Sequence, residues 1–279
     1  MSTERIFVTG PTGKVGSLVV RELIKRDVSV TVYARSPEKV QKNAHTTVVQ
    51  GDFNDLTPFE NAISGHTRLF CSLWAPPTTQ KPKPSLHKRH MTPVVDLSAI
   101  ELPWRTYALT NVLEQAEEKI FNLPNRGSYV SLRPTNFMTD TLYVVDSIKT
   151  KDAIIDAASP EELQEWISPR DIAEVGVNVL LDPVEKHGDA AYELIGDLIT
   201  PVQRAAILTG AVRRKITYKQ IPVQELYDFY LKMFNFYALA YYLAAYNRTN
   251  PVVRGLPILL GREPESYEAC VANNKQAFQ

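Results

Sequence analysis

Residues 6–26 read IFVTGPTGKVGSLVVRELIKR, and this stretch decides the fold. Ile6–Thr9 predicts a buried strand, and the helical spacing of apolar residues after Gly16 predicts an amphipathic helix. Between them, Gly10, Gly13 and Gly16 stand in the order G-x-x-G-x-x-G. A turn of this kind presents the N–H groups and the dipole of a helix N-terminus to a diphosphate. The stretch therefore predicts a dinucleotide-binding turn, with a plain glycine turn as the alternative.

Each glycine has its own task in such a turn. Gly10 permits the tight change of direction, Gly13 lets the dinucleotide approach the backbone, and Gly16 lets the helix pack close to the strand. The context of a strand before and a helix after the glycines makes this interpretation more specific than the glycines alone.

The end of the second predicted strand indicates which dinucleotide binds. Residues 33–36 read YARS, with no acidic residue before Glu38, although an NAD site would place Asp or Glu here to hold the ribose hydroxyls. Arg35 can instead form a fork to the 2′-phosphate of NADP(H), and Lys14 and Lys39 can add positive charge. We therefore predict NADP(H); the alternative is that Arg35 only points into solvent.

A third strand is followed by Gly51, Asp52 and Phe53, and then by Asp55. Asp52 can accept a hydrogen bond from the adenine amino group while Phe53 packs on the adenine ring. Both aspartates can equally cap the next turn. We favour the cofactor role for Asp52 and leave the two roles open for Asp55.

Alternation of short β-branched runs with amphipathic stretches predicts an α/β protein with a doubly wound, parallel, Rossmann-type sheet. We expect residues 1–150 to form the NADP-binding domain, with later segments returning to it, and residues 151–279 to form a smaller, mixed α/β lobe with the substrate pocket. The six predicted strands of the sheet are Ile6–Thr9, Val28–Tyr33, Thr46–Gln50, Arg68–Leu73, Val94–Leu97 and Tyr129–Leu132.

In the C-terminal part, we expect one long helix from Val223 to about Tyr246 and a last helix that begins at Pro264. Aromatic residues recur along the long helix, among them Tyr227, Tyr230 and Phe234. They suit a core or an interface between lobes, and also the wall of a pocket for a flat substrate. Residues 75–93 hold five prolines and a basic cluster, which predicts an irregular connection of unassigned role.

Composition excludes several function classes. Thirty-one basic residues balance thirty-one acidic ones, which argues against direct nucleic-acid binding. No apolar run is long enough to span a bilayer, and residues 1–10 contain no secretory segment, so we expect a cytoplasmic protein without a membrane partner. The five histidines show no spacing for a metal site, and a homodimer is left open.

The ordered motifs GPTGKVG, YARSPEK, VVQGDFND, VVDLSA, SLRPTNFM and WISPRDIAEVGVNVLLDP resemble the NmrA-like family of atypical short-chain dehydrogenases/reductases. The resemblance runs over most of the chain. It implies that NADP(H) is held by a set of residues from the turn and the next two strands, and that a later run lies near the nicotinamide. The first set is Gly10, Thr12, Gly13, Val15, Gly16, Arg35 and Asp52; the later run is Pro134, Thr135, Asn136 and Phe137.

The catalytic residues depart from the usual pattern. Short-chain reductases use Tyr-x-x-x-Lys, in which the lysine lowers the pKa of the tyrosine that donates a proton. Here Tyr107 is followed four residues later by Asn111. Ser98 and Tyr107 are the candidates for binding and protonating a substrate carbonyl, although Tyr107 is also well explained as a buried aromatic residue.

These observations support two functions. The first is an NADPH-dependent oxidoreductase acting on a small, flat carbonyl, quinone or enone. The second is a non-catalytic sensor of the NADP(H) redox state that acts through a regulatory protein partner, which would allow a nuclear location.

Overall fold

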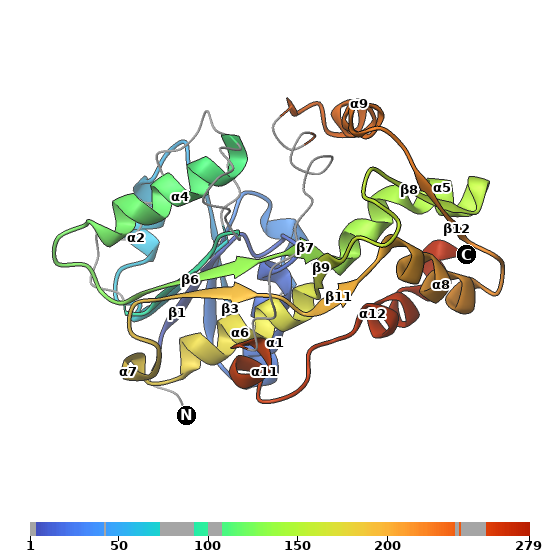
Figure 1. The fold of residues 1–279 in the computed structure, drawn as a ribbon. Coiled ribbons are helices and arrows are strands. Elements are labelled where there is room, and N and C mark those ends of the chain that lie inside the picture. The colour runs from blue at the N-terminus through green and yellow to red at the C-terminus, as the bar shows by residue number, and fades with distance from the viewer. Residues whose placement is uncertain (1–3, 42, 73–91, 100–107, 238–239, 241–254) are drawn as a thin grey trace. The chain divides into compact units, whose positions relative to one another are not determined.

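The computed structural model describes the chain except for residues 1–3, 42, 73–91, 100–107, 238–239 and 241–254 (Figure 1). The chain divides into two compact units and passes between them several times. The first unit comprises Met1–Trp104, Thr110–Pro134 and Pro169–Glu193. The second unit comprises Arg105–Leu109, Thr135–Ser168 and Leu194–Gln279.

The first unit is built on a seven-stranded sheet with the order β10-β6-β5-β4-β1-β2-β3. The pairs from β6 to β3 are all parallel, which confirms the predicted Rossmann-type α/β fold. The chain runs from β1 outward to β3 and then returns to β4 on the other side of β1, so the strand order reverses at β1. Ligands of such sheets bind at the carboxyl ends of the strands beside this reversal. The strands are β1 (Ile6–Thr9), β2 (Val30–Ala34), β3 (Thr46–Gln50), β4 (Arg68–Cys71), β5 (Val94–Leu97), β6 (Tyr129–Pro134) and β10 (Ala190–Leu194).

Helices pack on both faces of this sheet because its strands are buried on both sides. Leu69 of β4 joins a cluster with residues of α2 and α4, whereas the next residue, Phe70, contacts Gly176 of α6. Helix α6 also packs along α1, where Arg26 donates to Asn178 Oδ1 at 2.8 Å. The helices of the first unit are α1 (Gly16–Lys25), η1 (Pro37–Lys39), α2 (Thr57–Ala62), α4 (Ala108–Phe121), α6 (Pro169–Leu181) and α7 (Val184–His187).

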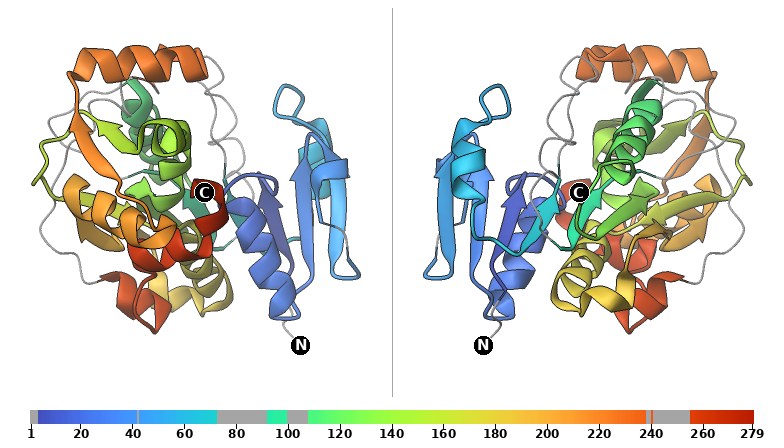
Figure 2. Two further views of the ribbon diagram at one scale, coloured as in Figure 1. Left: turned by 90° about the vertical axis from the view of Figure 1, so that its right-hand side faces the viewer. Right: turned by 90° about the vertical axis from the view of Figure 1, so that its left-hand side faces the viewer.

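The second unit contains two small sheets and a group of helices (Figure 2). Its core includes Met138, Ile148, Trp166, Leu208 and Tyr267. One sheet has the order β11-β9-β7, with β7 (Asn136–Phe137), β9 (Gln164–Ile167) and β11 (Asp197–Ile199); the other pairs β8 (Ala153–Asp156) with β12 (Thr217–Gln220). The helices are η3 (Met138–Val144), α5 (Val145–Lys151), α8 (Pro201–Val212), α9 (Val223–Phe234), α11 (Gly255–Leu260), α12 (Tyr267–Asn273) and α13 (Lys275–Phe278).

Two predictions for the C-terminal part were wrong. Helix α9 ends at Phe234 because Asn235 adopts the left-handed conformation, with φ of 49°, and its N–H donates to the carbonyl of Leu231. Asparagine tolerates this conformation better than most residues. The helix expected to begin at Pro264 begins instead at Tyr267, after Ser266, whose Oγ accepts the N–H of Ala269 at 3.1 Å.

Within the first unit, a buried side-chain hydrogen bond joins β5 to β6 in addition to their backbone pairing. The Tyr129 hydroxyl donates to Asp96 Oδ2 at 2.9 Å, and both side chains are fully buried. Burial, and then the negative charges of Asp96 and Glu117, raise the pKa of Tyr129, so its hydroxyl remains a donor. The bond gives the buried carboxyl group a partner that water cannot provide there.

We expect Tyr129→Phe to lower the free energy of unfolding by about 2 kcal/mol, because a buried carboxyl group loses a hydrogen bond. Urea unfolding followed by circular dichroism measures this. Tyr237→Phe is the matched control, since Tyr237 is 61% exposed, and it should change stability by less than about 0.5 kcal/mol. Equal stability of the two variants would contradict a stabilising role for the Tyr129–Asp96 bond.

Candidate functional site

The turn between β1 and α1 brings three backbone segments into contact. Gly10 has a φ of +65°, and a Cβ atom there would lie 2.2 Å from the carbonyl oxygen of Ser72. A Cβ atom on Gly16 would lie 2.1 Å from the carbonyl oxygen of Gly10. At Gly13, in contrast, an added Cβ would meet the protein only at 3.4 Å. The fold itself therefore requires glycine at positions 10 and 16. At position 13 the fold does not require glycine, so the absence of a side chain there leaves space for a ligand to approach the backbone.

The same turn leads into an uncapped helix. Thr12, Gly13 and Lys14 are exposed, Val15 and Gly16 are buried, and α1 has no side-chain hydrogen bond at its N-cap. A helix N-terminus without a side-chain cap can bind an anion, although here the N–H groups of Ser17 and Leu18 already donate to the carbonyls of Gly13 and Val15. The turn thus has the form that a diphosphate site requires.

Arg35 directly follows β2 and is exposed, as is Lys39 in η1. Asp52 follows β3, and its Oδ1 accepts the N–H of Asn54 at 2.8 Å. This bond lowers the pKa of Asp52, and the charge of Arg35 acts in the same direction. Asp52 is therefore a carboxylate acceptor at neutral pH.

The residues around Asp52 are held by the core of the first unit. The hydroxyl of Tyr33 donates to the carbonyl of Asp52 at 2.8 Å, and the Phe53 ring lies 5.4 Å from that of Tyr33. Asp55 accepts the N–H of Thr57, the first residue of α2, at 2.9 Å. This contact supports the capping role for Asp55, while the roles of Asp52 and Phe53 toward adenine stay predictions.

Residues 134–137 cross from one unit to the other. Pro134 ends β6 in the first unit, whereas Thr135 belongs to the second and donates its N–H to the carbonyl of Leu194 at 3.2 Å. Asn136 and Phe137 form β7, in register with Trp166 and Ile167 of β9. Asn136 also lines a pocket of the second unit.

The two catalytic candidates stay predictions. Ser98 follows β5 and is 7% exposed, and its Oγ has no hydrogen bond among the residues that the structure describes. Its buried hydroxyl is therefore available to form a hydrogen bond with a ligand. Tyr107 lies outside the described residues.

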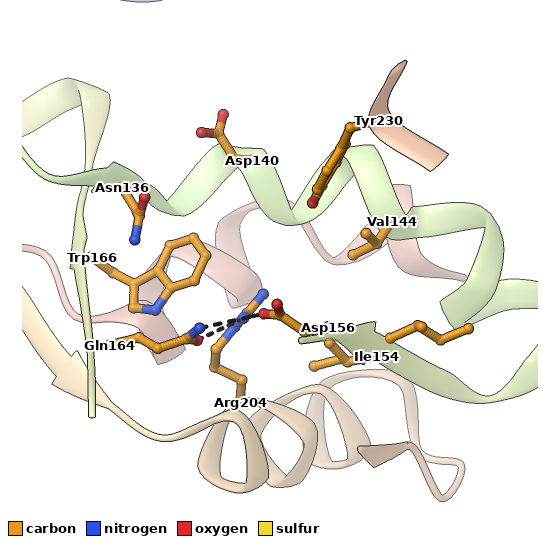
Figure 3. A pocket seen from close by; sticks show the side chains of 10 residues that line it. Asn136, Asp140, Val144, Ile154, Asp156, Gln164, Trp166, Arg204 and Tyr230 are labelled. Carbon is orange, nitrogen blue, oxygen red and sulfur yellow. Dashed lines mark hydrogen bonds and ion pairs between the residues drawn. The ribbon is translucent and has the colours of Figure 1, made fainter. Parts of the chain in front are cut away.

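The pocket of the second unit is partly open to solvent and has a cavity volume of about 50 Å³ (Figure 3). Side chains from β7, η3, β8, β9, α8 and α9 surround it. Its lining combines aromatic and aliphatic walls with several polar groups. The lining residues are Asn136, Asp140, Val144, Ile154, Ile155, Asp156, Gln164, Trp166, Arg204 and Tyr230.

Arg204 is the central polar residue of this pocket. Its Nη1 donates to Gln164 Oε1 at 3.0 Å and to Asp156 Oδ2 at 3.4 Å, and its Nε donates to the Tyr267 hydroxyl at 3.2 Å. The guanidinium carbon lies 4.1 Å from the centroid of the Trp166 ring. These contacts hold a buried positive charge in one orientation.

The sequence analysis did not single out Arg204, Asp156, Gln164 or Trp166. They come from β8, β9 and α8, and no spacing along the chain relates them. One local signal was available: Arg204 is the single charged residue of Pro201–Val212, and a charge on the buried face of a helix needs a partner.

Among the described part of the chain, no helix is long and apolar enough to cross a membrane. Within the same residues, no group of three or more His, Cys, Asp or Glu side chains is placed to hold a metal ion.

The fold and the turn define a Rossmann-type, dinucleotide-binding protein. Residues 10–121 match the family model described as NAD(P)H-binding. The prestalk A differentiation protein A of Dictyostelium discoideum is 26% identical, over 94% of this chain and 90% of that protein.

Solved structures share the fold over nearly the whole chain. A nucleoside-diphosphate-sugar epimerase of Staphylococcus aureus has a TM-score of 0.83 at 17% identity, covering 96% of this chain and 99% of that one. An NADPH-dependent quinone oxidoreductase of Escherichia coli has a TM-score of 0.80 at 20% identity, covering 96% and 99%. A mutant NmrA has a TM-score of 0.77 at 15% identity, covering 98% and 95%.

Residues 10–121 thus match a family of NAD(P)H-binding domains, and the chain as a whole shares its fold with NmrA. The cofactor is a nicotinamide dinucleotide, NAD(P)H, as the turn predicted.

We expect Gly10→Ala to lower the free energy of unfolding by about 2 kcal/mol or more, because alanine at positive φ is strained and its Cβ meets the Ser72 carbonyl. NADPH binding should weaken at least about tenfold as the turn shifts. Urea unfolding and fluorescence titration measure the two effects.

Gly210→Ala is the matched control, because Gly210 lies in α8 and an added Cβ meets nothing within 4 Å. It should raise stability by up to about 1 kcal/mol and leave NADPH binding unchanged. A Gly10→Ala protein as stable as Gly210→Ala would show that the close approach to Ser72 is not a constraint.

Proposed function

We propose that this protein is an NADPH-dependent oxidoreductase that acts on a small, flat carbonyl, quinone or enone. The observation that carries the NADP(H) preference is Arg35, an exposed guanidinium directly after β2 in the position where an NAD site has an acidic residue. A guanidinium can bind a phosphate through two parallel hydrogen bonds. Lys39, exposed in η1, adds positive charge nearby in the sequence.

The absence of a lysine four residues after Tyr107 favours a quinone or a related hydride acceptor as the substrate. Asn111 stands where a short-chain reductase would have the lysine that assists Tyr107. A quinone takes up hydride to give a stable hydroquinone anion, and water can then protonate it, so the protein need not supply a strong acid. The likeness to a quinone oxidoreductase agrees with this substrate class.

The pocket of the second unit supports a flat substrate. The indole of Trp166 and the phenol of Tyr230 are both part of its lining, together with the aliphatic Ile154 and Val144. Asn136, which the family resemblance places near the nicotinamide, lines the same pocket.

A second function, an NADP(H) redox sensor that acts through a protein partner, is favoured by the same Asn111. A protein that only senses the cofactor has no need of an assisted tyrosine. The two functions predict the same cofactor site and differ in turnover alone.

We expect Arg35→Ala to weaken NADPH binding by roughly 10- to 100-fold, the effect of losing charge-assisted hydrogen bonds to a phosphate, and to leave NADH binding unchanged. Fluorescence titration with both cofactors measures this. Arg21→Ala removes an equally exposed arginine, from helix α1, and should bind both cofactors as the wild type does. Equal losses for NADPH and NADH would refute the assignment of Arg35 to the 2′-phosphate.

We expect the wild-type protein to oxidise NADPH in the presence of duroquinone, a fully substituted benzoquinone that does not alkylate thiols. Absorbance of NADPH at increasing quinone concentration gives the rate, and a panel of aldehydes and enones defines the range of substrates. Tight NADPH binding with no oxidation by any of these compounds would favour the sensor.

A further inference from the structure

We infer that the pocket of the second unit selects an uncharged, planar carbonyl compound, and that the guanidinium of Arg204 and the hydroxyl of Tyr230 donate hydrogen bonds to its carbonyl oxygen. This inference rests on the proposed function for the use of the pocket, but its donors and its charge follow from contacts inside the second unit alone.

Arg204 keeps one donor group for a ligand. Its side chain is 3% exposed, and its Nε and Nη1 are used by Tyr267, Gln164 and Asp156. Its Nη2 makes no hydrogen bond to any residue that the structure describes, and Figure 3 shows the guanidinium reaching into the pocket. A buried guanidinium with an unused N–H₂ group lacks part of the solvation that it had in water, so an acceptor in the pocket is favourable.

Tyr230 supplies the second donor from helix α9. Its ring is stacked on that of Phe234, with 6.1 Å between centroids, and meets the edge of Phe229 at 5.3 Å. Its hydroxyl points into the pocket and makes no hydrogen bond within the described residues (Figure 3). Burial, with the nearby charge of Asp156, raises the pKa of Tyr230, so the phenol stays protonated and acts as a hydrogen-bond donor.

The charge of the lining excludes a carboxylate ligand. Asp156 lies 3.4 Å from the Arg204 guanidinium and offsets its charge, and Asp140 adds a second carboxyl group to the lining. An anionic ligand would meet a guanidinium whose charge Asp156 already offsets and would be repelled by that carboxylate, whereas a neutral carbonyl accepts the two hydrogen bonds without this repulsion. The side chains of Trp166, Tyr230 and Ile154 give the lining apolar surface that suits a planar ring.

The test is the binding of duroquinone to the full-length protein without NADPH, measured by isothermal titration calorimetry, so that no turnover is needed. Tyr230→Phe keeps the ring contacts and removes only the hydroxyl, and it should weaken duroquinone binding roughly three- to tenfold. Tyr227→Phe is the matched control: Tyr227 lies on the same helix, packs with Ile221 and Leu226, and does not line the pocket. It should bind duroquinone as the wild type does.

A tetramethylbenzoate, which has a similar ring and a negative charge, should bind at least about tenfold more weakly than duroquinone. Wild-type affinity for duroquinone in Tyr230→Phe, or binding of the benzoate as tight as that of the quinone, would overturn the inference. If duroquinone binds as expected but NADPH is not oxidised, the inference about the pocket is supported and the proposed oxidoreductase function is refuted. If the Tyr230→Phe variant oxidises NADPH with the same kcat/KM as the wild type, the oxidoreductase function is supported and the role of Tyr230 in the pocket is refuted.

Discussion

The close approach of the backbone at Gly10 and Gly16 is the constraint on which the first unit depends. A side chain at either position would push β1, α1 or Ser72 apart by more than an ångström, since the added Cβ would lie 2.1–2.2 Å from a carbonyl oxygen. Residues 10–15 lead from the carboxyl end of β1 into α1, which begins with no side-chain cap. The same close packing thus shapes the turn that is predicted to bind a diphosphate. Stability and cofactor binding share one cause here.

The second unit depends on a different kind of interaction. Arg204 connects α8 to β8, β9 and α12 through Asp156, Gln164 and Tyr267. A charge buried in this way is tolerated only where partners surround it. Since those partners occupy two of its three nitrogens, the guanidinium both organises the unit and keeps one group directed at the pocket. A site of this kind has its polar groups oriented before a ligand arrives, which reduces the ordering that binding requires.

Much of the first unit was predictable because its signals are local. Strands β1, β3 and β5 have the predicted bounds, and the glycine turn lies between a strand and a helix as expected. Elements of the second unit were harder to predict from the sequence. Strands β7, β8, β9 and β11, of two to four residues each, were not predicted. The end of α9 was missed because nothing in the apolar pattern marks the left-handed turn at Asn235.

The amino-acid sequence by itself determined the Rossmann-type domain and the class of its cofactor, because the glycine turn and the strand–helix alternation around it are local patterns along the chain. Only the tertiary structure decided which side chains line the pocket, since Asn136, Asp156, Gln164, Arg204 and Tyr230 come from five elements that no spacing relates. A phosphate-binding turn uses backbone groups of one segment, so a short stretch of sequence is enough to predict it. Recognition of a small ligand uses side chains that converge from all directions, and that convergence exists only after the unit has folded.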